Sequence, residues 1–271
     1  MTASYSMPVA KLLTLGDPRN ERKWRDYLAL GIKSEHVPDL IRMMQDEELR
    51  WADSESKEVW ANLHAWRALG QLRAESAIEP LLGLLRDMDE YDDWTGEEVP
   101  RVLAMIGVSA IPWLTKFISE SSHGMWAREA AAKALKEIAE RYPKSRDECK
   151  SIIARQLEQF ATQGPTLNAF FMTYLLDLKA IEYATVMESA FTAAKVDLAV
   201  NGDWEDVQIE LGLLKKRKTP RPNYVLEKFF GERDLPDTIE PPRDEAVDAA
   251  IWRLEMDGIL KPKSERQKKK K

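Results

Sequence analysis

The sequence feature that most constrains the fold is an apolar face of four residues that returns along the chain. Its clearest copy occupies positions i, i+3, i+4 and i+7 of one segment, and consists of Ile78, Leu81, Leu82 and Leu85. That spacing places all four side chains on one side of a helix. Pro80 lies in the first turn of this helix, where a missing backbone N–H costs nothing. Gly70 and the polar residues after it are typical of a turn out of an earlier helix.

The same face recurs along the chain, and its five copies begin at Val37, Ile78, Ile111, Cys149 and Tyr183. The intervals between these residues are 41, 33, 38 and 34 residues. The Ser/Thr-x-x-Glu pattern of a capping box marks three expected helix starts, at Ser76/Glu79, Thr95/Glu98 and Ser145/Glu148. Helical spacing also precedes each copy, at residues 24–31, 59–70, 95–107, 126–139 and 167–178. Two helices per repeat, with little strand signal, are typical of an α-solenoid.

Two of these units resemble a known repeat family. The segments ALGQLRAESAIEPLLGLL and LAMIGVSAIPWLTKFI are similar to HEAT-like repeats, in particular the short bacterial kind that also occurs in phycobilin lyases. The resemblance covers roughly residues 20–195. It implies an all-α chain, an α-solenoid of about five HEAT-like helix pairs. It says little about function, because the family includes scaffolds, lyase subunits and a DNA glycosylase branch.

The remaining segments suggest the domain organisation. Residues 1–19 are expected to form an N-terminal arm, and residues 20–199 the HEAT-like repeats. Residues 200–260 are expected to form a helical C-terminal cap, with one helix starting near Asn201 or Asp203 and a final amphipathic helix over 244–260. Residues 261–271 carry seven Lys or Arg against one Glu, which predicts a basic, disordered tail.

Charge, cysteine use and hydropathy bound the cellular setting. The net charge is −6 and the tail contributes +6, so the other 260 residues carry −12. An acidic body repels phosphates, so we expect nucleic acid to bind at most weakly through the basic tail. Cys149 is the only cysteine, which excludes a disulfide within the chain. Neither a secretory signal nor a membrane span is apparent, so we expect a cytoplasmic protein that does not bind membranes.

The sequence offers no catalytic or metal-binding constellation. His36, His64 and His123 have no metal-ligand spacing, and neither a phosphate loop nor a nucleophile elbow is present. Residues 87–98 match an EF-hand loop only in part, because Tyr91 replaces an oxygen ligand and Asp92 replaces the glycine of the sharp turn. We therefore expect no catalytic residue, no metal and no cofactor.

Tryptophans and the outward positions of the second helices indicate a binding surface. Four of the nine tryptophans do not fit core faces: Trp51, Trp94, Trp113 and Trp126. In HEAT-like stacks the second helices line the concave surface, so residues between their core positions are expected to face a partner. These predicted partner-binding residues are Asp39, Arg42, Met43, Glu79, Arg86, Trp113 and Lys116. Their mixture of Arg, Lys, Met and Trp is typical of protein interfaces, although Trp113 could equally pack on the adjacent repeat.

The predicted function is therefore a non-catalytic scaffold or assembly factor that recognises a protein or peptide on the concave face. The resemblance leaves two alternatives open. One is a phycobilin-lyase-like subunit that attaches or chaperones a tetrapyrrole. The other is a HEAT-like DNA-binding or glycosylase protein, against which the charge of −12 on residues 1–260 argues.

Overall fold

The computed structural model describes residues 4–19, 23–88 and 93–222. Of these residues 69% are helical, and no strand occurs among them, which confirms the all-α fold class. The chain divides into two compact units, Met1–Tyr224 and Val225–Lys271, and every described residue belongs to the first. The predicted helix over 244–260 and the basic tail lie outside the described residues.

The described helices fall into two sets that alternate along the chain from residue 61 onward. The first helices are α3 (Ala61–Leu72), α5 (Asp93–Ile106), α7 (Met125–Arg141) and α9 (Pro165–Asp177). The second helices are α1 (Val37–Met44), α4 (Ile78–Asp87), α6 (Ile111–Ser119), α8 (Arg146–Leu157) and α10 (Ala184–Thr192). Shorter helices are α2 (Glu47–Arg50), α11 (Leu198–Asn201) and α12 (Trp204–Glu210).

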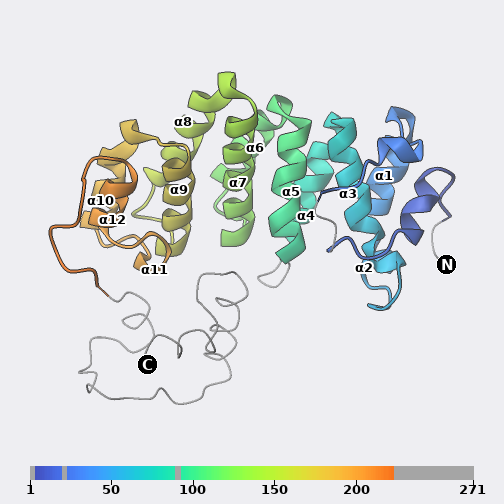
Figure 1. Ribbon diagram of the computed structural model, residues 1–271, viewed down its shortest axis with the longest axis horizontal. Helices are drawn as coiled ribbons and strands as arrows, with labels where there is room; N and C mark the ends of the chain where they lie inside the picture. The colour runs from blue at the N-terminus through green and yellow to red at the C-terminus, as the bar shows by residue number, and fades with distance from the viewer. Residues whose placement is uncertain (1–3, 20–22, 89–92, 223–271) are drawn as a thin grey trace, which may run out of the picture. The chain divides into compact units, whose positions relative to one another are not determined.

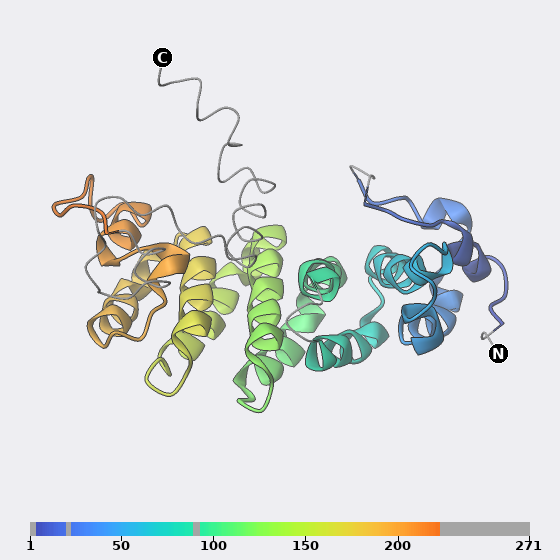
Figure 2. The same ribbon diagram turned by 90° about the horizontal axis from the view of Figure 1, so that it is seen from below.

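The first helices pack against one another in chain order. α3 contacts α5, α5 contacts α7, and α7 contacts α9, so the four lie next to one another (Figure 1). The second helices pack on them: α1 on α3, α4 on α5, α6 on α7 and α8 on α9. Figure 2 shows α4 running beside α5, which is seen almost end-on. Alanines on α7, including the fully buried Ala130, Ala131 and Ala134, allow close approach at the centre of this packing.

Each second helix begins in the same way. A 3-10 turn leads directly into it, and these turns are η3 (Ser34–His36), η5 (Glu75–Ala77), η6 (Val108–Ala110), η7 (Pro143–Ser145) and η8 (Ile181–Tyr183). Three second helices begin at the predicted residues Val37, Ile78 and Ile111, whereas the fourth begins three residues before Cys149 and the fifth one residue after Tyr183. The pattern of apolar faces therefore located these helices correctly.

The predicted capping boxes are wrong. Ser76 lies inside η5, and the residue before α4 is Ala77, whose backbone is already helical at φ −87° and ψ −8°. The 3-10 turn already supplies a carbonyl that accepts the hydrogen bond of the first N–H of the helix. A side-chain cap would therefore find no unpaired N–H there. Ser145 precedes α8 but makes no capping bond. Thr95 lies within α5, which starts at Asp93.

The connection after α3 also differs from the prediction. Gly70 does not end the helix, which continues to Leu72 before Arg73 adopts the left-handed conformation at φ 52°. A Cβ at position 70 would lie 3.3 Å from Val102 Cγ1 and 3.4 Å from Met105 Sδ. Gly70 therefore serves the close packing of α3 on α5 rather than the turn.

The first unit lacks the first helix that its spacing predicts. Residues 24–31 contain only a 3-10 turn, η2 (Leu28–Leu30), which ends at Gly31 with φ 92°. In place of a helix, the N-terminal segment packs on α3 through η1 (Val9–Thr14), where Val9 and Leu12 are fully buried. Part of the expected N-terminal arm thus belongs to the core.

Candidate functional site

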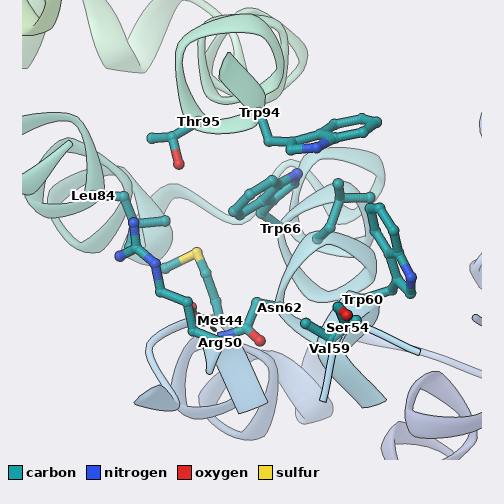
Figure 3. Close-up of a pocket in the computed structure, with 11 residues that line it drawn as sticks. Met44, Arg50, Ser54, Val59, Trp60, Asn62, Trp66, Leu84, Trp94 and Thr95 are labelled. Atoms are coloured by element: carbon teal, nitrogen blue, oxygen red, sulfur yellow. Dashed lines mark hydrogen bonds between the residues drawn. The ribbon is translucent and has the colours of Figure 1, made fainter. Parts of the chain in front are cut away.

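A cleft lined by three tryptophans lies beside α3, and we call it the tryptophan cleft. Its volume is about 320 Å³, and it opens to solvent. Side chains from α1 to α5 surround it (Figure 3): Met44, Arg50, Ser54, Val59, Trp60, Asn62, Leu63, Trp66, Leu84, Trp94 and Thr95. Most of these side chains are apolar, so the cleft suits an apolar group of a ligand.

The three indoles differ in exposure and in what holds them. Trp60 and Trp94 meet edge to face, with ring centroids 5.6 Å apart and an angle of 83° between their planes. The guanidinium of Arg19 lies 5.1 Å from the ring of Trp60. Trp66 is 6% exposed, whereas Trp94 is 36% exposed and stands at the rim. Edge-to-face pairs of this kind are stabilising, so the rim is a formed surface before any ligand arrives.

A buried ion pair fixes Trp66. Its indole Nε1 donates to Glu98 Oε2 at 3.0 Å, and Arg67 Nε donates to the same oxygen at 2.7 Å. Arg67 Nη2 donates to the other carboxylate oxygen, which makes the pair bidentate. Burial alone would lower the pKa of Arg67, but the hydrogen bonds and charge of Glu98 raise it above its usual value. Glu98 therefore ties α5 to two neighbouring side chains of α3.

Trp24 covers this pair from the N-terminal segment. Its ring centroid lies 4.9 Å from Arg67 Cζ and 4.3 Å from Arg101 Cζ, within the range of cation–π contacts. Trp24 lies in the segment 24–31, where helical spacing predicts a helix, and its ring instead contacts two guanidinium groups.

Asn62 forms the floor of the cleft by capping α1. Its Nδ2 donates to the backbone carbonyls of Met43 and Met44, both at 3.1 Å, and to that of Asp46 at 3.0 Å. Met43 and Met44 are the last two residues of α1, where carbonyls lack donors from a following turn. The carbonyls of Met43 and Asp46 also accept from the backbone N–H groups of Asp46 and Arg50, at 3.2 Å and 3.0 Å.

Replacing Asn62 with Ala removes this cap. We expect the free energy of unfolding to fall by about 1–3 kcal/mol, because the carbonyls at the end of α1 lose the buried side-chain donor that they share. Urea unfolding followed by far-UV circular dichroism measures the change. Gln45→Ala, at the exposed end of the same helix, is the control, and equal effects of both substitutions would contradict the capping role.

A second hollow adjoins the cleft, and we call it the acidic hollow. It has a volume of about 470 Å³ and is lined by Trp94, Glu97, Glu98, Arg101 and Glu137. Trp94 therefore belongs to both cavities.

The carboxylates of the acidic hollow differ in their partners. Glu97 is exposed and pairs with Lys133 Nζ at 3.0 Å. Glu137 forms no hydrogen bond or ion pair with the described residues. Burial raises the pKa of Glu137, although the charges of Lys133, Lys136 and Arg101 oppose that rise.

The predicted second-helix site is only partly exposed. Glu79, Arg86 and Lys116 are exposed, and Trp113 is 47% exposed on α6, as expected of outward positions. Asp39 is half-buried and pairs with Arg42, whose Nη2 lies 3.0 Å from its carboxylate. None of these residues lines the tryptophan cleft or the acidic hollow.

Two findings change the part of that site on α1. Met43 is fully buried, so its prediction as an outward residue is wrong. The reason is that α1 turns Leu40, Met43 and Met44 into the core, while Val37 and Ile41 remain half-buried. Arg42 is exposed but already engaged, because its guanidinium lies 4.3 Å from the ring of Tyr5 and donates to the carbonyl of Ser4 at 3.2 Å.

Sequence reasoning missed the tryptophan cleft, although it held one signal of it. The four tryptophans that fit no core face are all exposed, at 80% for Trp51, 36% for Trp94, 47% for Trp113 and 36% for Trp126. The sequence alone therefore indicated that Trp94 is not a core residue. Trp60 and Trp66 fall within the helical spacing expected over residues 59–70, which concealed that they and Trp94 surround one cleft.

The histidines and the cysteine have structural partners. His64 lies between the hydroxyl of Tyr27 at 2.7 Å and the carbonyl of Gly16 at 2.8 Å. His123 stacks on Phe117 with centroids 4.0 Å apart. Cys149 is fully buried, as expected of a core position, and burial raises the pKa of its thiol to about 12.

Within the described ranges, no three His, Cys, Asp or Glu side chains are grouped so that they could hold a metal ion. Residues 89–92 of the EF-hand-like loop lie outside those ranges. In the same part of the chain, no single helix combines the length and the hydropathy that crossing a membrane requires. Comparisons of the chain with protein-family models, with curated proteins and with solved structures find no match.

Proposed function

We propose that this protein is a scaffold built as a HEAT-like α-solenoid, and that it binds a peptide segment of a partner protein in the tryptophan cleft. The solenoid reading is supported by the packing of α3, α5, α7 and α9 in chain order and by the 3-10 turn that precedes each second helix. The observation that carries the function is the open cleft of about 320 Å³ walled by Trp60, Trp66 and Trp94.

The composition of the cleft favours a peptide side chain as its ligand. Tryptophan and arginine are the residue types that dominate binding energy at protein interfaces, and both line this cleft. Its volume lies at the lower end of the range for small-molecule sites, which suits one or two large apolar side chains. Burying such a side chain contributes roughly 25 cal/mol per Å² of apolar surface removed from water.

The charges around the cleft disfavour the two alternatives. An open-chain tetrapyrrole carries propionate groups, and nucleic acids carry phosphates. Both would meet Glu97, Glu98 and Glu137 in the hollow that shares Trp94 with the cleft. Among the residues that line the cleft, Arg50 is the only cation, and the neighbouring hollow adds three carboxylates, so neither alternative is proposed.

The second-helix surface around Trp113 and Lys116 remains the competing location for the same function. Both side chains are exposed on α6, but they line neither described cavity. The tryptophan cleft is favoured because a partly enclosed apolar pocket removes more ligand surface from water than a single exposed indole does.

A peptide library tests the proposal. The probe is a set of synthetic peptides Ac-Gly-X-X-Z-X-X-Gly-NH2, in which X is any residue and Z is Leu, Phe or Ser in three separate sublibraries. We expect the immobilised full chain to retain the Leu and Phe sublibraries over the Ser sublibrary, because only the former have an apolar side chain for the cleft.

A charge placed in the cleft should abolish this preference. Leu84→Glu puts a carboxylate on the apolar wall, and Val108→Glu, at an apolar residue that is 49% exposed and lines neither cavity, is the matched control. Retention that is equal for Leu, Phe and Ser, or that is lost equally in both folded variants, would refute the cleft as the binding site. Circular dichroism establishes that each variant is folded.

A further inference from the structure

We infer that the preferred occupant of the tryptophan cleft is a tryptophan side chain of the partner, whose indole N–H donates a hydrogen bond to Asn62 Oδ1 at the floor of the cleft. The inference rests on the proposed function, because it names the anchor residue of the peptide that the cleft binds. A purely apolar side chain would leave the oxygen of Asn62 without a partner.

Buried polar atoms without a partner are concentrated near the cleft. In the part of the chain that the structure describes, three buried side-chain N or O atoms form no hydrogen bond: Ser56 Oγ, Asn62 Oδ1 and Arg67 Nη1. All three belong to residues 56–67, the segment that also carries Trp60 and Trp66. Buried polar groups in folded proteins are normally paired, so each exception calls for a reason. Of these three residues only Asn62 lines the cleft.

The end of α1 fixes the orientation of the Asn62 amide. Nδ2 donates to the carbonyls of Met43, Met44 and Asp46, so Oδ1 occupies the other end of the amide. Exchanging the two atoms would set the oxygen against three carbonyl oxygens, which also accept. Figure 3 shows the nitrogen of Asn62 on the side of Met44 and the oxygen turned toward the side of Val59, another residue that lines the cleft. The unpaired acceptor is therefore held in place.

Asn62 lies at the deep end of the cleft, where the tip of a side chain reaches it better than a peptide backbone does. Asn62 is 7% exposed and Met44 is 1% exposed, whereas Trp94 at the rim is 36% exposed. A ligand backbone that stays at the rim cannot bring its N–H to this depth. The donor must therefore stand at the far end of a long side chain.

The wall beside Asn62 is the part of the cleft best able to adjust to such a side chain. Water does not reach Oδ1 in the empty cleft, so a ligand must displace a lining side chain to meet it. Ser54 and Val59 come from the connection between α2 and α3, which contains only turns, bends and the 3-10 turn η4 (Glu58–Trp60). Changes of side-chain rotamer are common at interfaces on binding, and one such change would open Oδ1 to the ligand.

Tryptophan matches both the apolar walls and the unpaired acceptor. It has a large apolar body, one N–H donor at its edge and no acceptor. Leu and Phe bring no donor, and a Tyr hydroxyl brings lone pairs that would face apolar walls. A Lys or Arg tip would bring a charge into a cleft whose only charged lining residue is the cation Arg50. The edge-to-face pair of Trp60 and Trp94 also offers a surface that suits a further aromatic ring.

Two peptide sublibraries that differ only in the indole N–H test the inference. The probes are Ac-Gly-X-X-Z-X-X-Gly-NH2, in which X is any non-aromatic residue and Z is Trp or 3-benzothienylalanine. In the second of these residues a sulfur atom replaces the N–H in a ring system of nearly the same shape. We expect the immobilised full chain to retain the Trp sublibrary about tenfold over the benzothienylalanine sublibrary, and both over a Ser sublibrary. Tenfold is the effect of about one net hydrogen bond to a neutral acceptor.

Asn62→Ala attributes this discrimination to the oxygen. The variant should retain the Trp and benzothienylalanine sublibraries within about twofold of each other, and still both over Ser, because ligands of the same shape respond alike to an altered floor. Gln45→Ala is the control, since it removes an exposed amide at the end of α1 that lines neither cavity, and it should keep the tenfold discrimination. Circular dichroism establishes that each variant is folded, and the wild-type comparison decides by itself if Asn62→Ala does not fold.

The outcomes separate this inference from the proposed function. Equal retention of the Trp and benzothienylalanine sublibraries by the wild type, or a discrimination that survives in folded Asn62→Ala, would overturn the inference alone. A preference for Leu and Phe over Ser that does not extend to Trp would do the same. Failure of the folded wild type to prefer any apolar sublibrary over Ser would overturn the proposed function and the inference with it.

Discussion

Replacing Glu98 with Gln is expected to lower the free energy of unfolding by about 3–5 kcal/mol, the cost of breaking a buried ion pair by removing one partner. Arg67 is 3% exposed and Glu98 is 8% exposed, so the guanidinium that remains cannot recover its lost partner from water. Arg67 Nη1 already lacks a hydrogen-bond partner among the described residues, so weakening the pair would leave more of this buried guanidinium without a partner. The free energy of unfolding of small domains is only about 5–15 kcal/mol, so the substitution should remove a large part of it.

Urea unfolding with far-UV circular dichroism measures this prediction. Glu97→Gln is the control on the same helix, and it should change stability by no more than about 0.5 kcal/mol because the carboxylate of Glu97 is exposed to water. The double variant Arg67→Met/Glu98→Leu removes both charges and should recover part of the loss, because the buried indole N–H of Trp66 still lacks its acceptor. A loss below about 1 kcal/mol for Glu98→Gln would show that the pair is not desolvated in solution.

The second helices were predictable because their signals are local. An apolar face at i, i+3, i+4 and i+7, with a proline in the first turn, defined the starts at Val37, Ile78 and Ile111. Such a face can be recognised from about ten consecutive residues, and it predicts which of their side chains are buried. For the same reason the face that begins at Cys149 missed the actual start of α8 by three residues, since the turn before it carries no apolar marker.

The partners of Glu98 were not predictable from local sequence. The Thr95-x-x-Glu98 spacing is typical of a capping box, but Glu98 instead pairs with Arg67, 31 residues earlier, and with Trp66. The choice between a local cap and a distant ion pair depends on how α3 and α5 pack, and a single sequence does not encode that register in any short pattern. The missing first helix before α1 has a similar origin, because Trp24 is held by Arg67 and Arg101.

The residues of the candidate site form no short sequence motif, and the fold brings them together from distant positions in the chain. Its lining residues run from Met44 to Thr95 and come from five helices and the turns between them. The sequence identified Trp94 as a residue that fits no core face, which was a correct signal, but placed the partner surface on the second helices by analogy with HEAT-like stacks. Only the packing of α3 against α5 brings Trp60, Trp66 and Trp94 together.

Trp94→Ala separates the two candidate surfaces and is the second prediction with a large effect. Trp94 forms the rim of the tryptophan cleft, so its removal should weaken the binding of a ligand there. We expect the affinity for a fluorescent peptide retained from the Leu or Phe sublibrary to fall about thirtyfold, which corresponds to roughly 2 kcal/mol for a buried interface anchor. Fluorescence anisotropy titrations of the wild type and the variant measure the change.

Trp113→Ala is the matched control, because it also removes an exposed indole, but one on α6 that lies in neither cavity. It should leave the affinity within about twofold of the wild type. Trp94→Ala should cost only about 1 kcal/mol of stability, chiefly through the lost edge-to-face contact with Trp60, so the variant remains folded for the titration. The reverse result, with Trp113→Ala losing affinity and Trp94→Ala retaining it, would place the partner on the second helices. In that case the predicted surface of Glu79, Arg86 and Lys116 would replace the tryptophan cleft as the binding site.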